Sequence, residues 1–109
     1  MPNMSTSKFR NKKTIVDGIT FDSKKEAKRY FDLLMLEKAK LITDLEMQPK
    51  YDLMVNGKKI GFYKADFRYF CKARKKVIVE DVKSEPTKTP VYRLKKKILD
   101  TLGVEIMEI

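Results

Sequence analysis

Asp81, Val82 and Lys83 place an acid and a lysine two positions apart, just beyond Glu80 and the apolar run Val77 to Val79. Such a run is typical of a buried strand, and residues i and i+2 of a strand project from the same face. The carboxylate could hold a divalent cation that polarises a phosphodiester, and the ammonium group could orient water and offset developing negative charge. The chain has three acid-x-lysine triplets, and only this one lies on a predicted strand, at its C-terminal end. Its surroundings must therefore decide its meaning.

A second acid, Asp66, is expected beside Asp81. The segment ADFRYFCK predicts a strand that starts near Asp66, and ARKK predicts the turn into the strand VIVEDVK. Pairing about a turn centred near positions 73 and 74 puts Asp66 opposite Asp81, with Cβ atoms about 5 Å apart. Two carboxylates at that separation repel unless a proton or a cation lies between them. A divalent-cation site is one explanation, and two solvated acids at a sheet edge are the alternative.

Two predicted helices each offer one further residue. Ser23 and Glu26 match a capping box, which predicts a helix from Ser23 to about residue 40 with Glu26 inside its apolar arc. Glu26 could serve the acidic site, the helix cap or both. Lys95 falls in the apolar arc of a helix predicted from Pro90 to about residue 102, where it could be a second catalytic cation or could extend to solvent. The apolar members of that arc are Val91, Leu94, Ile98 and Leu102.

The remaining pattern predicts the elements that hold these residues. Asp17-Gly18 and Asn56-Gly57 suit tight turns, so hairpins are expected over 14–21 and 51–63. Two strands follow, then the second helix, which Gly103 ends, and the final short strand VEIMEI. The order of helix, strands, helix and strand predicts an α/β (α+β) fold.

Composition limits the classes of function. The 109 residues suffice for one domain, and we expect a basic flexible arm over 1–12 and a single domain over 13–109. The net charge of +10 favours a polyanionic partner. Histidine is absent and Cys71 is the single cysteine, which excludes histidine catalysis, internal disulfides and most zinc sites. Since there is no long apolar run and no signal-peptide pattern, we expect a cytoplasmic protein that does not enter a membrane.

Cations gather in three places that could contact a phosphate backbone. We expect the N-terminal arm and the last helix with its preceding loop to bind DNA. The turn over 72–76 carries less weight, because it lies at the end of its hairpin away from Asp66. Solvated surface charge is the alternative for each cluster. The expected DNA-binding residues are Lys8, Arg10, Lys12, Lys13, Lys88, Arg93 and Lys96.

In combination these features resemble the PD-(D/E)XK nuclease superfamily. The likeness consists of a helix with Glu26, then Ala65-Asp66, then Asp81-Val82-Lys83 in an αβββαβ order, over about residues 12–107. The segments FDSKKEAKRYFDLLML, MQPKYDL, KADFRYF, VIVEDVKSEPT and YRLKKK are also similar to small phage-encoded endonucleases related to Holliday-junction resolvases. Ala65 departs from the proline of the superfamily name, at a position that such enzymes keep loosely.

The resemblance implies a restriction-endonuclease-like core, with a central mixed sheet flanked by helices. It implies a Mg²⁺-dependent endonuclease, with Mn²⁺ able to substitute, in which Glu26, Asp66 and Asp81 are the acidic site residues. Lys83 is then the catalytic lysine and the Val82 carbonyl a further metal ligand. It also implies a homodimer acting on branched DNA in the cytoplasm of a phage host. A duplex endonuclease or nickase on the same scaffold, or a non-catalytic basic DNA-binding protein with structural acids, are the alternatives.

Overall fold

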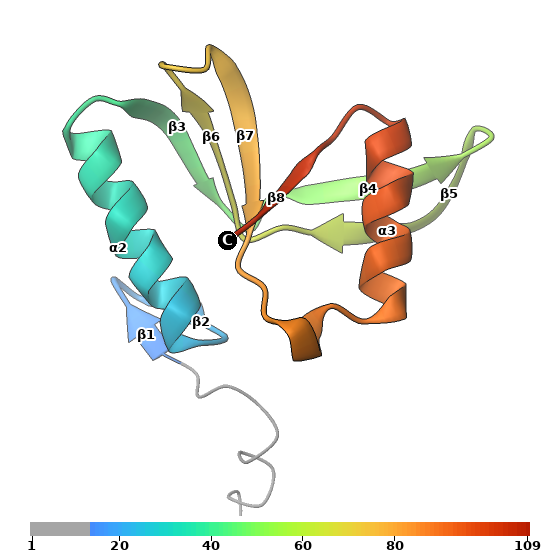
Figure 1. The fold of residues 1–109 in the computed structure, drawn as a ribbon, viewed down its shortest axis with the longest axis horizontal. Coiled ribbons are helices and arrows are strands. Elements are labelled where there is room, and N and C mark those ends of the chain that lie inside the picture. Colours follow the sequence, from blue (N-terminus) through green and yellow to red (C-terminus); the bar gives the residue numbers. More distant parts are fainter. Residues whose placement is uncertain (1–13) are drawn as a thin grey trace, which may run out of the picture.

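The computed structural model describes residues 14–109 as an α+β fold around a four-stranded mixed sheet (Figure 1). In chain order the elements are β1 (Thr14–Val16), β2 (Ile19–Phe21), α2 (Lys24–Lys38), β3 (Ile42–Met47), β4 (Lys50–Val55), β5 (Lys58–Lys64), β6 (Phe67–Cys71), β7 (Lys76–Asp81), the 3₁₀ helix η1 (Glu85–Thr87), α3 (Pro90–Thr101) and β8 (Ile106–Glu108). The sheet has the order β3-β6-β7-β8, in which only β7 and β8 run parallel. The predicted fold class is confirmed, with α2, β3, β6, β7, α3 and β8 in αβββαβ order. The predicted arm and its residues Lys8, Arg10, Lys12 and Lys13 lie outside the described residues.

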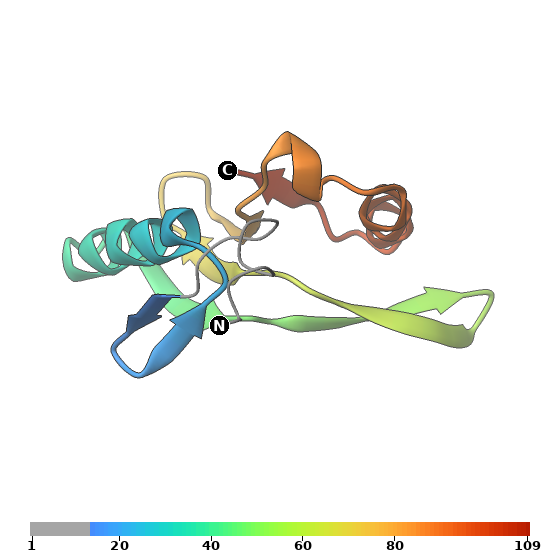
Figure 2. The same cartoon turned by 90° about the horizontal axis from the view of Figure 1, so that it is seen from below.

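The first strand of the sheet, β3, is not predicted by the sequence pattern. Asp44 adopts a positive φ of 57° inside it, and the pairing with β6 shifts register at this bulge, which breaks the alternation that marks a strand. The predicted hairpin of 51–63 forms as β4 and β5 but extends away from the sheet (Figure 2). From here on, 'the arm' means this hairpin, residues 50–64, and not the N-terminal segment. Backbone bonds from Gln48 N to Asp66 O (2.8 Å) and from Ala65 N to Pro49 O (3.0 Å) join the arm to the sheet.

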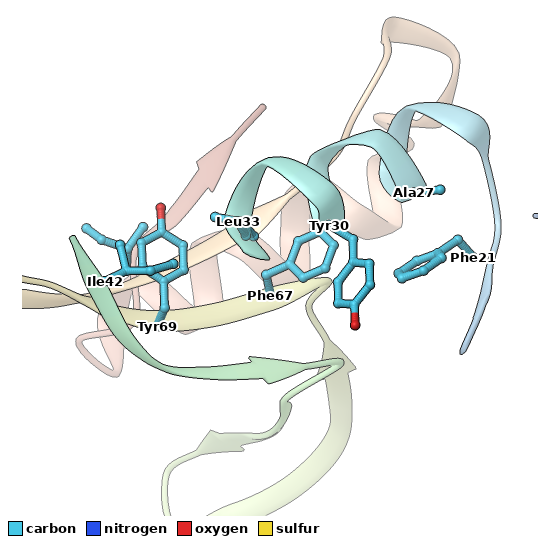
Figure 3. Close-up of a cluster of buried hydrophobic side chains, with 8 residues drawn as sticks. Phe21, Ala27, Tyr30, Leu33, Ile42, Phe67 and Tyr69 are labelled. Carbon is cyan, nitrogen blue, oxygen red and sulfur yellow. The ribbon is translucent and has the colours of Figure 1, made fainter. Parts of the chain in front are cut away.

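Helix α2 covers one face of the sheet. Its predicted cap is confirmed, because Ser23 Oγ accepts from Glu26 N at 3.0 Å. The residues that pack between α2 and the sheet are Phe21, Ala27, Tyr30, Leu33, Ile42, Phe67, Tyr69 and Ile78 (Figure 3 labels all but the last). Leu41 does not continue this buried face, because the helix ends at Lys38 and Lys40 turns the chain with a φ of 63°, which leaves Leu41 55% exposed.

Helix α3 packs against the arm and the other side of β7. Its buried residues are Tyr92 and Leu99, so the arc predicted to face the core is wrong: Val91 and Leu94 are 61% and 60% exposed. The Tyr92 ring offers more apolar surface to bury than Val91 or Leu94 does. Its hydroxyl also donates to Glu108 at 2.7 Å, and this bond fixes the helix with Tyr92 turned toward the core. The second core cluster consists of Leu53, Tyr63, Ala65, Val79, Tyr92, Leu99 and Ile106.

A buried ion pair joins α2 to the centre of the sheet. Glu80 on β7 has 0% exposure, and its carboxylate accepts from Arg29 Nε at 2.8 Å and Arg29 Nη2 at 2.6 Å. Tyr69 on β6 donates its hydroxyl to the same carboxylate. Arg29 lies one helical turn after Glu26, and Glu80 directly precedes Asp81. The pair therefore sets the distance between the helix and the strand that carry two of the predicted site acids.

Removal of Arg29 should destabilise the fold far more than removal of a surface cation. Arg29→Ala leaves the Glu80 carboxylate buried without its charged partner, which costs about 3–5 kcal/mol of unfolding free energy. Lys28→Ala is the matched control, because Lys28 is exposed on the same helix and pairs with Asp32 at 3.8 Å, an interaction worth about 0.5 kcal/mol or less. Urea unfolding followed by circular dichroism measures both. Equal losses in the two variants would contradict this role for Arg29.

Candidate active site

The expected pairing of Asp66 with Asp81 is present. Phe67 pairs with Glu80 in the β6–β7 ladder, which places Asp66 opposite Asp81 where β6 begins and β7 ends. Asp66 N donates to Asp81 Oδ1 at 3.0 Å, and Val82 N donates to Asp66 Oδ2 at 2.7 Å. Each carboxylate thus reaches the backbone of the other chain segment, and the two acids are held side by side.

Glu26 joins this pair from the first turn of α2. Its side chain is buried, with 6% exposure, whereas Glu37, further along the same helix, is exposed. Glu26 Oε1 accepts from Asp22 N at 3.3 Å, which satisfies a backbone donor at the start of the helix. The Asp66 carboxylate lies near enough for its charge to raise the pKa of Glu26. Glu26 therefore belongs to both the helix cap and the acidic cluster.

Burial raises the pKa of all three carboxyl groups. Desolvation is the largest cause, and it raises the pKa of Glu26 to about 7, the pKa of Asp81 to about 6 and also the pKa of Asp66. The neighbouring charge of Asp66 raises the pKa of Glu26 further, whereas the Lys83 ammonium opposes the rise at both aspartates. The cluster thus binds protons near neutral pH, and a divalent cation could replace them.

Lys83 lies next to the acids, as its electrostatic effect on both aspartates shows. Its backbone N–H donates to Ile109 O at 3.3 Å, and its carbonyl accepts from Lys25 Nζ at 3.0 Å. The Lys83 ammonium lies 4.4 Å from the ring centroid of Tyr92. The lysine is therefore positioned by α2, α3 and the C-terminal strand together.

A groove of about 250 Å³ lies beside the cluster, between the start of α2 and the segment that follows β7. The lining residues are Ser23, Lys24, Lys25, Val82, Lys83, Ser84 and Thr87. The groove gives a solvent-borne group access to Lys83 and to the residue that follows Asp81.

Asp81 Oδ2 is the atom that best fits a metal ion. Among residues 14–109, only this oxygen and Tyr63 Oη are buried side-chain atoms without a hydrogen-bond partner, a state that is costly for a carboxylate. No three or more His, Cys, Asp or Glu side chains form a metal-binding group within the described range. Mg²⁺, however, is commonly held by one or two carboxylates with water and substrate phosphate. Asp66, Asp81 and the Val82 carbonyl fit that pattern, with Glu26 adjoining.

Lys95 lies against the arm and not against the acids. Its ammonium donates to the carbonyl of Phe62 on β5 at 3.2 Å, and it lines a pocket between the arm and α3. That pocket is also lined by Lys83, which connects it to the acidic cluster. Of the two roles that the sequence left open, the extension away from the core describes the observed side chain better.

The three described members of the expected DNA-binding set, Lys88, Arg93 and Lys96, lie together. They line a groove of about 530 Å³ along α3. Glu108 organises this groove, because it accepts from the Tyr92 hydroxyl at 2.7 Å and from Lys96 at 3.2 Å, and it pairs with Lys88 at 3.3 Å. The Tyr92 hydrogen bond and the two lysines lower the pKa of Glu108 to about 2, so it stays ionised.

Sequence reasoning missed Arg29, Glu80 and Glu108. A signal existed for Glu80, since strand alternation turns it toward α2, where a carboxylate is buried only with a partner. Arg29 stands on the inner side of that helix, one turn after Glu26. Glu108 gave no local signal, because its partners come from α3 and the loop before it.

The chain belongs to the family described as a protein of unknown function (DUF1064), whose model matches residues 6–107. Comparisons with curated proteins and with solved structures gave no match. Neither helix of the described range has the length and apolar character needed to cross a membrane. The family description names no activity, so the function has to be argued from the site.

Without metal, the folded protein should lose stability as the pH rises from about 4.5 to about 7. The pKa of Glu26 rises from 4.5 to about 7 on folding, so the folded state keeps a proton that the unfolded state releases in that window. Stability from this group is complete below pH 4.5 and is lost as the pH passes 7, with a contribution on the order of 3 kcal/mol.

Glu26→Gln tests this expectation. The amide can still accept from Asp22 N but cannot titrate. The unfolding free energy should therefore fall less between pH 5 and pH 7 than in the parent, by the contribution of about one proton. Urea unfolding in EDTA at pH 5, 6 and 7 measures the slope. Glu37→Gln, at an exposed position of the same helix, should keep the slope of the parent. Parallel slopes for Glu26→Gln and the parent would show that Glu26 does not hold the proton.

Proposed function

We propose that this DUF1064 protein is a Mg²⁺-dependent DNA endonuclease that hydrolyses phosphodiester bonds, with Mn²⁺ as a substitute metal. The observation that carries the proposal is the meeting of Asp66 and Asp81 at adjacent strand ends, with a buried Asp81 oxygen that has no hydrogen-bond partner. The nearness of Lys83 to both acids supports it further. So does the αβββαβ order, which the PD-(D/E)XK nuclease superfamily shares.

Each site residue has a distinct role in the proposed reaction. Asp66, Asp81 and the Val82 carbonyl would hold the metal ion, which when bound supplies the positive charge that polarises the scissile phosphate. The Lys83 ammonium orients the attacking water and offsets negative charge that develops on the phosphate oxygens. Glu26, whose pKa lies near neutral pH, can take up or release a proton beside Asp66.

The positive surface supplies affinity for the DNA backbone. Lys24 and Lys25 line the groove at the start of α2, where the helix N-terminus adds further positive potential. Lys88, Arg93 and Lys96 line the larger groove along α3. Contacts of this kind hold phosphates without reading bases, which favours recognition of DNA shape.

Branched DNA, such as a Holliday junction, is the proposed substrate. This choice follows the resemblance to phage enzymes related to junction resolvases, which act as two-fold dimers. We therefore propose a homodimer that works in the cytoplasm of the host cell. Symmetric paired cuts in a four-way junction are the product that such a dimer would leave.

Asp81→Asn should reduce cleavage of a four-way junction in Mg²⁺ by about 100-fold or more, because the amide holds a cation poorly. DNA binding should survive. Asp32→Asn, which changes an exposed acid on α2, should cleave as the parent does, and EDTA should stop all cleavage. Gel assays on a junction, a fork and a plain duplex measure the rates.

Unchanged cleavage by Asp81→Asn, or no cleavage by the parent, would leave a DNA-binding protein with structural acids. Equal cutting of all three DNAs would keep the nuclease and remove the preference for branches, as expected of a duplex endonuclease or a nickase.

Arg93→Gln should weaken binding to DNA of any sequence. Each lost phosphate contact should also reduce the slope of log affinity against log salt concentration by about 0.9. Lys38→Gln is the control, since it removes one exposed charge at the last turn of α2 and outside the α3 groove. Fluorescence anisotropy with a labelled junction at several salt concentrations measures both variants. Identical slopes for the two would exclude the α3 groove as a phosphate-binding surface.

A further inference from the structure

A second pocket, of about 330 Å³, lies between the arm and α3. Its volume falls in the range of pockets that hold small organic ligands. The polar and aromatic residues that line it include Phe62, Lys64, Lys83, Thr87, Thr89 and Lys95. Lys83 and Thr87 also line the groove beside the acidic cluster, so the pocket and the groove share a wall.

Phe62 is the exposed aromatic residue of this pocket, with 47% of its surface accessible. The other two aromatic lining residues, Tyr63 and Tyr92, are buried and pack against each other. The ammonium groups of Lys50 and Lys95 lie 4.4 Å and 6.0 Å from the Phe62 ring centroid. An exposed aromatic ring beside cations is the combination that proteins use to stack a nucleobase and hold its phosphate.

The cations of the pocket retain capacity for an anion. Lys95 Nζ donates one hydrogen bond, to Phe62 O at 3.2 Å, and an ammonium group has three donors. Lys64, at the end of β5, is exposed. Residues 50–64 contain four lysines and one aspartate, a net charge of +3 for the arm. The arm thus attracts a polyanion toward the pocket.

We propose that this pocket binds one unpaired nucleotide of branched DNA, with the base stacked on Phe62 and the phosphate against Lys64 and Lys95. The inference rests on the proposed nuclease function and adds a means of substrate selection. A paired base costs a few kcal/mol to unstack, whereas an unpaired base at a branch is free to enter. Lys95 then positions the substrate next to the Lys83 that faces the acids.

A second copy of this chain is the competing occupant. Ile60, Val91 and Leu94 are also exposed apolar residues on the arm and α3. In a two-fold contact through the arm, however, the two surfaces of charge +3 would face one another and repel. Charge therefore favours DNA over a second copy.

Phe62→Ala tests the pocket, with Ile60→Ala as its matched control. Ile60 is 59% exposed two residues earlier on β5 and does not line the pocket. Phe62→Ala should bind a fork with unpaired arms about 5- to 100-fold more weakly than the parent, because one base stack is worth that much. Its binding to blunt duplex should be unchanged. Ile60→Ala should match the parent on both DNAs, and Phe62→Trp should retain fork binding.

Fluorescence anisotropy in EDTA measures affinity without cleavage, and 2-aminopurine at the first unpaired nucleotide reports stacking. The fluorescence should be quenched by the parent and recover in Phe62→Ala. If Phe62→Ala binds the fork as tightly as the parent does, and the parent cleaves junctions, the proposed pocket is overturned and the nuclease proposal stands. Selective loss of fork binding, in a protein whose parent cleaves nothing, supports the pocket and overturns the nuclease. If Phe62→Ala no longer self-associates in analytical sedimentation but still binds the fork, the face belongs to a contact with a second copy and the inference is overturned.

Discussion

The fold depends on the compensation of one buried charge. Glu80 sits in the middle of the sheet with no exposure. Its carboxylate accepts two hydrogen bonds from Arg29 and one from the Tyr69 hydroxyl, and these bonds make its burial possible. Because this contact joins α2 to β7, it fixes the helix against the strand at one point. Glu26 lies one helical turn before Arg29 on α2, and Asp81 lies directly after Glu80 on β7. The position of the acidic cluster is therefore a consequence of how one carboxylate is neutralised.

The buried or half-buried acids of the described range fall into two kinds. Glu80 and Glu108 have full sets of partners, and the pKa of Glu108 is correspondingly low. Glu26, Asp66 and Asp81 are buried or half-buried without such neutralisation, and burial raises the pKa of each. Proteins tolerate uncompensated polar groups chiefly where function requires them. The contrast separates the acids that hold the fold together from the acids that are available to a cation.

Local signals explain which parts of the sequence could be interpreted in advance. The Asp17-Gly18 and Asn56-Gly57 turns and the Ser23 cap depend on adjacent residues, and the register of Asp66 with Asp81 follows from one turn and simple alternation. Strand β3 was not predicted, because the Asp44 bulge interrupts that alternation. The face of α3 could not be predicted either, since a hydrogen bond from its Tyr92 to distant Glu108 decides it. Features set by adjacent residues could thus be predicted, whereas those set by a bulge or by a distant partner could not.

The arm connects through Ala65 to Asp66, the first residue of the acidic pair. Phe62 and Asp66 are four residues apart, and Ala65 between them is 1% exposed in the second core cluster. The backbone bonds of Ala65 with Pro49 and of Asp66 with Gln48 brace the bend where the arm leaves the sheet. A nucleotide held at Phe62 would thus be placed relative to Asp66 by covalent geometry and two ladder bonds, with no mobile domain between them. In the proposed enzyme, recognition of the branch and positioning of the scissile phosphate are therefore a single structural event.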